Sequence, residues 1–259
     1  MNEPRPNKNL GQHWLYDRAV LEAICAEAEL LATDTVLEVG PGLGTLTQIL
    51  TQQVQKVVAV EFDRQLAAEL PKRVPAKNLE VITADILAFD FTQLPPGYKV
   101  VANVPYYITS KITRNLLESA NPPQSATLLV QKEVAQRMAA APGDMSILAI
   151  AVQLYSEVRL GMIVPAALFT PPPQVDSQVI TLIRRNQPLF SDIDQSLFFR
   201  IVRAGFGEKR KKLRNSLSGG LHMEKSDVES WLQRAAISLD VRAEQLSLDD
   251  WYKLSKQFS

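Results

Sequence analysis

The segment Asn103-Val104-Pro105-Tyr106 follows an apolar run that ends at Ala102. At the end of a buried strand, such a segment presents two hydrogen-bond acceptors beside an aromatic ring. These acceptors are the side-chain oxygen of Asn103 and a backbone carbonyl, which we assign to Val104. An exocyclic amino group on a flat ring has two N–H bonds to donate and a π-face to stack. The segment therefore predicts chemistry on the amino group of a base, and a strand-ending turn with a buried tyrosine is the alternative.

A glycine-rich turn, Gly40-Pro41-Gly42-Leu43-Gly44, lies between a predicted strand and a predicted helix. Glycine lets the backbone turn sharply and approach a ligand closely. An adenosine-containing cofactor is the usual occupant of such a turn in α/β proteins. A glycine-rich turn alone is a weak signal, because a tight connection can need glycine for no other reason.

Two acidic residues strengthen the cofactor interpretation. Glu61 ends the second predicted strand, where a carboxylate can accept hydrogen bonds from both ribose hydroxyls. Asp85 ends the third, where a carboxylate can accept from an adenine amino group. Each acid alone is more often a solvated charge, but both follow successive strands above the glycine turn.

Two cofactors fit this pattern, a dinucleotide and S-adenosyl-L-methionine. The dinucleotide fingerprint is Gly-x-Gly-x-x-Gly, whereas here the third glycine comes one residue early and Thr45 stands in the expected place. The shortened form, preceded by Glu38-Val39, suits a sulfonium cofactor that has no pyrophosphate to seat on the helix N-terminus. The sequence therefore favours methyl transfer.

The first half of the chain alternates strand and helix patterns, which predicts a parallel sheet covered on both faces. Beyond residue 187 the strand signal disappears, and apolar pairs at the i,i+4 spacing predict short helices. We therefore predict a first domain over residues 1–186 and a small all-helical domain over residues 187–259. The predicted strands are Thr35–Gly40, Lys56–Asp63, Leu79–Asp85, Tyr98–Val104, Ser125–Gln131, Val158–Val164 and Val179–Arg184.

Length and composition limit the class of protein, its compartment and its partners. The 259 residues suffice for a sizeable core, and the formal net charge of +0 argues neither for nor against nucleic acid as a partner. The single cysteine, Cys25, cannot form an internal disulfide and is interpreted as a core side chain of a protein in a reducing compartment. No apolar run is long enough to cross a membrane, so we expect a cytoplasmic protein. No His/Cys cluster has the spacing of metal ligands, so no metal site is predicted.

A basic cluster near the start of the helical domain is a candidate phosphate-binding surface. Charge runs are most often solvated helix faces, but this cluster accompanies a base-modifying pocket. Its members are Arg200, Arg203, Lys209, Arg210, Lys211, Lys212 and Arg214.

With these motifs in hand, the chain resembles the rRNA adenine N6,N6-dimethyltransferases, specifically their small-subunit branch. The resemblance covers nearly the whole chain. The matching motifs are Asn9–Leu15, Glu38–Thr47, Glu61, Ala84-Asp85, Asn103–Tyr107, Gln131–Ala135, Phe169–Ser177 and Phe206–Asn215. The chain departs from the family pattern at His13, Trp14 and Val104, where Asn, Phe and Leu are usual.

The resemblance implies a Rossmann-like class I methyltransferase sheet with a small all-helical C-terminal domain. It also implies that Tyr106 and Phe169 sandwich the target adenine while Asn103 holds its amino group. The residues implied to contact S-adenosyl-L-methionine are His13, Leu15, Gly40, Glu61, Asp85 and Asn103, and we add Gly42 of the glycine turn.

The implied reaction is dimethylation of N6 on two adjacent adenines of a small-subunit rRNA hairpin, during ribosome biogenesis. The implied partners are this rRNA and the pre-30S-type ribosomal particle, and we expect a monomer. The alternative is a large-subunit rRNA adenine methylase of the antibiotic-resistance type, although the segment Phe206–Asn215 points to the small-subunit branch. A non-catalytic nucleic-acid-binding relative would tolerate loss of the acids or of Asn103, which are all intact, and the glycine spacing disfavours a nicotinamide-dependent oxidoreductase.

Overall fold

The structure of the chain is a computed structural model that describes residues 6, 11–208 and 210–258. The chain divides into two compact units. The first contains Met1–Ala135 and Glu157–Arg184, and the second contains Gln136–Ser156 and Arg185–Ser259.

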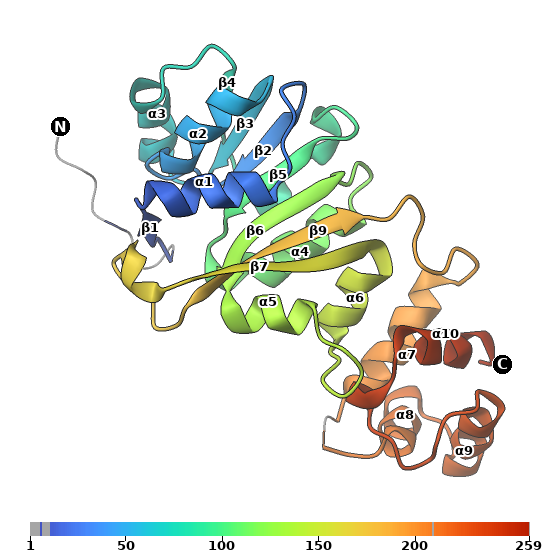
Figure 1. Cartoon of the computed structure of the whole chain (residues 1–259). Coiled ribbons are helices and arrows are strands. Elements are labelled where there is room, and N and C mark those ends of the chain that lie inside the picture. The colour runs from blue at the N-terminus through green and yellow to red at the C-terminus, as the bar shows by residue number, and fades with distance from the viewer. Residues whose placement is uncertain (1–5, 7–10, 209, 259) are drawn as a thin grey trace. The chain divides into compact units, whose positions relative to one another are not determined.

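A seven-stranded sheet forms the centre of the first unit, in the order β4-β3-β2-β5-β6-β9-β7 (Figure 1). The strands from β4 to β6 pair in parallel, as the alternating strand and helix pattern predicts, while β9 runs antiparallel to β6. The strand bounds are β2 Thr35–Val39, β3 Lys56–Glu61, β4 Leu79–Thr83, β5 Lys99–Asn103, β6 Ser125–Gln131, β7 Ser156–Val164 and β9 Ser177–Arg184.

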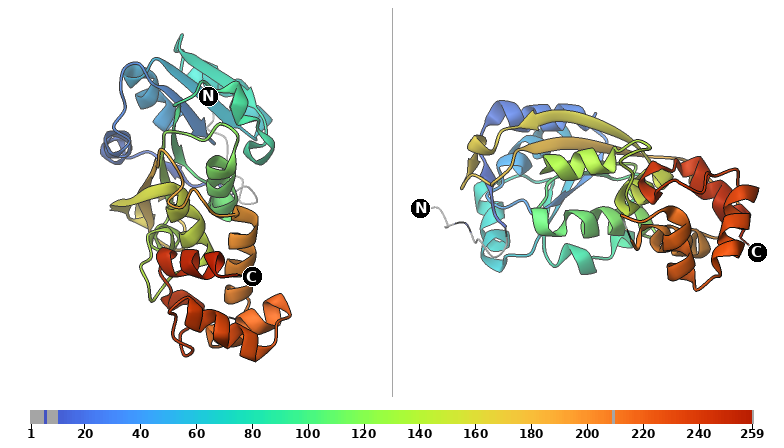
Figure 2. Two further views of the ribbon diagram at one scale, coloured as in Figure 1. Left: turned by 90° about the vertical axis from the view of Figure 1, so that its right-hand side faces the viewer. Right: turned by 90° about the horizontal axis from the view of Figure 1, so that it is seen from below.

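Helices cover both faces of this sheet. The apolar faces of α1 (Arg18–Glu27) and α2 (Thr45–Gln53) pack on one side, and Cys25 is buried in that core as predicted. The helix α4 (Thr109–Glu118) lies on the opposite face (Figure 2) and buries Ile112 and Leu116. The remaining helices of this unit are α3 Arg64–Arg73 and α5 Lys132–Met138, the second of which crosses into the other unit.

A separate two-stranded antiparallel sheet joins β1 (Trp14–Leu15) to β8 (Phe169–Thr170). Leu15 pairs with Phe169, and Trp14 pairs with Thr170. Strands of two residues leave no periodic pattern in a sequence, so this pairing was not predicted. As a result, the end of the N-terminal motif, Trp14-Leu15, lies beside the start of the Phe169–Ser177 motif, although the two are far apart in the sequence.

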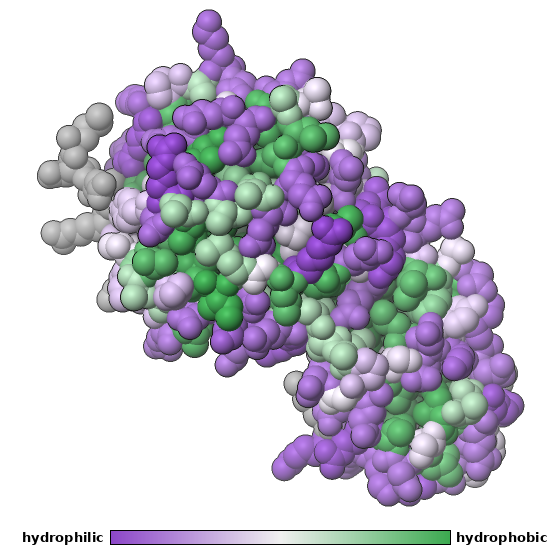
Figure 3. Space-filling view, in the orientation of Figure 1, coloured by the Kyte–Doolittle hydropathy of each residue, from purple (hydrophilic) through white to green (hydrophobic). Residues whose placement is uncertain are grey.

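The strand β7 forms one edge of the large sheet, and an exposed edge offers unpaired N–H groups. Hydrophobic side chains gather over it (Figure 3), including Leu160 and Ile163, which are both 45% exposed. The Glu27 carboxylate accepts a hydrogen bond from the Met162 N–H at 2.9 Å. A Cβ at Gly161 would lie only 1.6 Å from Glu27 Oε2, so glycine is required for this contact.

In the described part of the second unit the regular elements are helices, apart from Ser156 at the start of β7, and α6 is one of these helices. The buried side chains of α6, among them Ile150 and Leu154, pack in one core with those of the C-terminal helices. The predicted boundary at 186/187 therefore differs by two residues from the observed division, and residues 136–156 leave the first unit. The helices are α6 Ile147–Tyr155, α7 Gln195–Phe206, α8 Leu213–Leu221, α9 Lys225–Arg234 and α10 Leu248–Lys256.

The i,i+4 apolar pairs of the second unit lie on helices as predicted, except that Phe258, which pairs with Leu254, follows the end of α10. Leu213 and Leu217 on α8 are fully buried, and so are Val228 and Leu232 on α9. Within the part of the chain that the structure describes, no helix is long and apolar enough to cross a membrane.

Candidate active site

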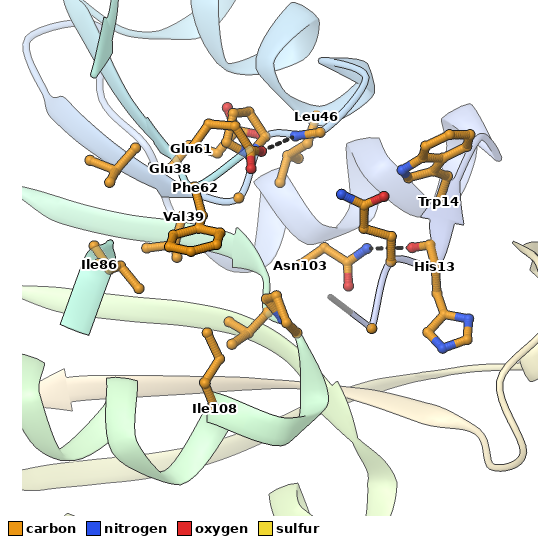
Figure 4. Close-up of a pocket in the computed structure, with 18 of the residues that line it drawn as sticks. His13, Trp14, Glu38, Val39, Leu46, Glu61, Phe62, Ile86, Asn103 and Ile108 are labelled. Carbon is orange, nitrogen blue, oxygen red and sulfur yellow. Dashed lines mark hydrogen bonds between the residues drawn. The ribbon is translucent and has the colours of Figure 1, made fainter. Parts of the chain in front are cut away.

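A pocket opens at the carboxyl ends of β2, β3, β4 and β5 (Figure 4). Within the sheet, β3 and β4 lie to one side of β2, and the next strand in the chain, β5, lies to the other side of β2. The strand order therefore reverses at β2. Ligands of open α/β sheets bind at such a switch point. The pocket lining includes the glycine turn, both predicted acids and the Asn103–Tyr107 segment, which the parallel strands bring together.

The glycine turn uses left-handed backbone at three positions. The φ angles are 64° at Gly40, 55° at Gly42 and 83° at Gly44, a region that residues with a Cβ rarely adopt. Gly44 is also the N-cap residue of α2, and a Cβ there would lie 2.6 Å from Leu70 Cδ1 and 2.9 Å from Val74 Cγ2. Packing between the turn and α3 therefore requires glycine at this position.

Gly44→Ala should destabilise the protein by about 2–4 kcal/mol, because backbone strain adds to overpacking against α3. Gly97→Ala is a matched control, since Gly97 has a φ of 80° but no atom within 4 Å of its added Cβ. It should cost only about 1 kcal/mol. Thermal unfolding of both variants measures the difference, and equal melting temperatures would contradict the packing argument.

Glu61 links the glycine turn to β3. Its Oε2 accepts from the Gly42 N–H at 3.1 Å (Figure 4), and its Oε1 accepts from the Asp63 N–H at 2.9 Å. Burial raises the pKa of Glu61, while these backbone hydrogen bonds oppose the shift. Each carboxylate oxygen retains a second lone pair, so the side chain can still accept from a ligand.

Asp85 is exposed at the rim of the pocket, and its Oδ1 accepts from the Leu87 N–H at 2.9 Å. The residues that follow the two acids, Phe62 and Ile86, also line the pocket and were not predicted. Their position next to a strand-end acid was the signal available in the sequence. Phe62 is 59% exposed and Ile86 is 6% exposed, so the two place apolar side chains at this part of the pocket, with Ile86 next to Asp85 in the chain.

The orientation of Asn103 is fixed by the N-terminal motif. Its Nδ2 donates to the backbone carbonyl of His13 at 3.3 Å (Figure 4), which leaves Oδ1 as the acceptor for a ligand. The ring of His13 forms a 2.7 Å hydrogen bond with the carbonyl of Pro171. It also stacks on Tyr106, with ring centroids 5.7 Å apart.

Tyr106 is anchored at its other end, where its hydroxyl lies 2.6 Å from Ser177 Oγ. Leu15 also lines the pocket, and its carbonyl accepts from Thr45 Oγ1 at 3.0 Å. These contacts bring the predicted residues of the N-terminal motif to the pocket beside Asn103.

Phe169 does not reach the pocket. It is 2% exposed, packs in the core with Leu15 and Val179, and is absent from the lining residues. Pairing of β8 with β1 directs it there. A sandwich of Phe169 and Tyr106 around a base therefore stays a prediction that requires the Phe169 side chain to move.

Glu38 is a further pocket residue, and its chemistry was not predicted. It is 1% exposed, and among the described residues its Oε2 has no hydrogen-bond partner. Burial raises the pKa of Glu38 to about 8, and the charge of Glu61 contributes in the same direction. A ligand that carries positive charge would favour the ionised form of these two buried carboxyl groups.

The predicted basic cluster lies in the second unit, except that Lys209 falls outside the described residues. Three members have acidic partners: Lys211 pairs with Glu208, Lys212 with Asp240 and Arg214 with Glu229. Among the described residues, no ion pair engages the three other members, which are exposed: Arg200, Arg203 and Arg210.

The switch-point pocket, the glycine turn and the strand-end acids define a class I methyltransferase. The family model described as "Ribosomal RNA adenine dimethylase" matches residues 4–259. The chain belongs to this family and is an rRNA adenine dimethyltransferase.

Relatives and solved structures agree with this family. "Ribosomal RNA small subunit methyltransferase A" of Dehalococcoides mccartyi is 41% identical, covering 96% of this chain and 87% of that protein. The protein of the same name from Moorella thermoacetica is 39% identical, covering 97% and 92%.

Among solved structures, a dimethyladenosine transferase from Plasmodium falciparum has a TM-score of 0.77 at 28% identity, covering 93% of this chain and 96% of that one. The 23S rRNA methyltransferase ErmE has a TM-score of 0.74 at 29% identity, covering 94% and 98%.

Proposed function

We propose that the chain uses S-adenosyl-L-methionine to dimethylate the N6 amino groups of two adjacent adenines in a small-subunit rRNA hairpin. The observation that carries the proposal is the fixed orientation of Asn103. Its Nδ2 is occupied by the His13 carbonyl, so Oδ1 is presented as an acceptor at the carboxyl end of β5. The similar proteins named small subunit methyltransferase A support the choice of subunit.

The residues of the pocket fit this cofactor. The glycine turn admits a ligand close to the backbone, and Glu61 has lone pairs for ribose hydroxyls. Phe62 and Ile86 offer apolar contacts for an adenine ring whose amino group donates a hydrogen bond to Asp85. A sulfonium would be stabilised by ionisation of the buried Glu38 and Glu61, whereas the negative pyrophosphate of a dinucleotide would gain nothing from it. The remaining proposed contacts are His13, Leu15, Gly40, Gly42 and Asn103.

When bound, the cofactor supplies an activated methyl group on a positively charged sulfur. Asn103 Oδ1 and the Val104 carbonyl accept the two N–H bonds of the target amino group, which turns its lone pair toward the methyl. Tyr106, held by Ser177, stacks on the base. Held in this way, the nitrogen would accept the methyl group that the cofactor supplies and would release one proton to solvent. Alignment of this kind can supply roughly 7–11 kcal/mol of the barrier.

Labelled methyl transfer to ribosomal particles tests this function. Unmethylated small ribosomal particles should accept two methyl groups on each of two adjacent adenines, as shown by nucleoside analysis of the product. Label in large-subunit RNA instead would favour the alternative, a large-subunit rRNA adenine methylase of the antibiotic-resistance type; the 23S rRNA methyltransferase ErmE is similar in structure. We also propose that the pre-30S particle is the natural substrate and that the protein acts as a monomer.

We further propose that the second unit binds RNA phosphates, and that the arginines without ion pairs contribute most. Reversing the charge of Arg203 and Arg210 together should weaken binding of an rRNA fragment and lower the slope of log K against log salt by about two. Lys225→Glu, on the exposed face of α9, is the control for a general charge effect. Salt-dependent binding titrations measure both, and an equal effect of the two changes would remove the cluster from the RNA interface.

A further inference from the structure

Two aromatic side chains of the pocket are left exposed to solvent. Phe62 is 59% exposed and Tyr107 is 61% exposed, and both line the pocket. Aromatic rings carry a large apolar surface, which is normally covered in the folded state or by a partner. Phe62 follows Glu61 and lies on the side of the pocket assigned to the cofactor. Tyr107 lies on the side of Asn103, where the base must enter.

The surroundings of Tyr107 differ from those of its neighbour Tyr106. The hydroxyl of Tyr106 is hydrogen-bonded to Ser177 Oγ and its ring stacks with His13, so these contacts hold the Tyr106 ring in place at the pocket. The hydroxyl of Tyr107 has no hydrogen-bond partner among the described residues. Its ring borders Gly11, where an added Cβ would lie 3.4 Å from Tyr107 Cδ1 and 3.6 Å from Cε1. This backbone supports one side of the ring and leaves most of its surface open.

We propose that Tyr107 is a stacking platform for the nucleobase next to the target adenine, a conclusion that rests on the proposed function. A base that enters the pocket leaves its stack, and its neighbour along the strand loses a stacking partner. Tyr107 follows Tyr106 in the short helix Tyr106–Ile108, and both line the pocket, so an exposed ring at Tyr107 is within reach of the strand whose base Tyr106 holds. An exposed aromatic ring there replaces the lost stacking without selecting a particular base, because every base has a π-face.

Loss of the Tyr107 ring should weaken binding of RNA and leave binding of the cofactor unchanged. Tyr107→Leu should raise the dissociation constant of an rRNA hairpin between roughly five- and 150-fold, which corresponds to about 1–3 kcal/mol. Tyr107→Phe keeps the ring and should bind like the wild type. Leu31→Ala is a matched surface control, since Leu31 is also 61% exposed and does not line the pocket. Phe62→Leu should show the reverse pattern, with weaker cofactor binding and unchanged hairpin binding.

A hairpin with 2-aminopurine next to the target adenine reports the stack directly. Its fluorescence should be quenched on binding the full-length wild type and the Tyr107→Phe variant, but not on binding Tyr107→Leu. Equal quenching by all three proteins would overturn the platform. Unchanged hairpin affinity in Tyr107→Leu would do the same while leaving the proposed function intact, provided that the wild type still methylates the unlabelled hairpin. Failure of the wild type to methylate adenine would instead defeat the proposed function.

Discussion

Asn103→Ala is expected to slow methyl transfer by roughly 100- to 1000-fold while changing the cofactor dissociation constant by less than about tenfold. The side chain does not supply a nucleophile. It supplies an acceptor whose direction is set by the 3.3 Å bond from Nδ2 to the His13 carbonyl. Without that acceptor the target amino group loses one of the two contacts that align its lone pair. Single-turnover methylation, together with calorimetric titration of the cofactor, measures both quantities.

Two further variants separate this mechanism from a loss of folding. Asn103→Asp keeps an acceptor but cannot donate to the His13 carbonyl, so it should retain more activity than Asn103→Ala. Asn78→Ala removes an amide that also donates to backbone carbonyls, those of Thr51 and Val54, away from the pocket. It should leave the rate of the folded protein unchanged. Near-wild-type turnover by Asn103→Ala would rule out alignment by two acceptors.

The position of the pocket could be predicted from the sequence because, in a parallel sheet, the order of strands and helices determines where the strand ends lie. Once alternating strands and helices predict a parallel sheet, the residues that end the strands must meet at one edge. Gly40, Glu61, Asp85 and Asn103 each stand at or just after such an end, and all four line the pocket. The run Ser125–Gln131 also gave the bounds of β6 correctly, because a strand buried on both faces reads as a largely apolar segment.

Contacts that depend on tertiary packing could not be predicted. The pairing of Leu15 with Phe169 turns that ring into the core, and strands of two residues leave no pattern that would reveal it. Ion pairs formed by Lys211 and Lys212 likewise depend on which acids the fold brings near. The helix α6 is apolar on most of its surface, so its sequence did not indicate which unit it packs with.

Glu38→Gln is expected to stabilise the cofactor-free protein at pH 8, but not at pH 4.5. The pKa of Glu38 rises from its ordinary value of 4.5 to about 8 in the folded state, because burial penalises the charged carboxylate. Between these pH values the folded protein holds a proton that the unfolded chain releases, so the contribution of Glu38 to stability falls as pH rises. Glutamine cannot titrate. The stability difference between variant and wild type should therefore grow by on the order of 4 kcal/mol across this window and stay level outside it.

Thermal unfolding of wild type and variant across this pH range measures the difference in their stabilities. The other titratable groups are present in both proteins, so the change of this difference with pH reports on Glu38. Glu133→Gln, on the exposed face of α5, should show no such divergence. A pH-independent difference for Glu38→Gln would mean that the buried carboxyl does not change ionisation in this range.

The same carboxyl should also distinguish the charge of its ligand. A sulfonium near Glu38 favours the ionised form, so cofactor binding should release a proton near neutral pH and tighten as pH rises toward 8. S-adenosylhomocysteine has a neutral sulfur and should lack this part of the pH dependence. In Glu38→Gln the preference for the charged ligand should shrink at pH 8, as measured by parallel titrations of the two ligands. If the preference were unchanged, Glu38 would act on the fold alone, and the positive charge of the cofactor would be balanced elsewhere in the pocket.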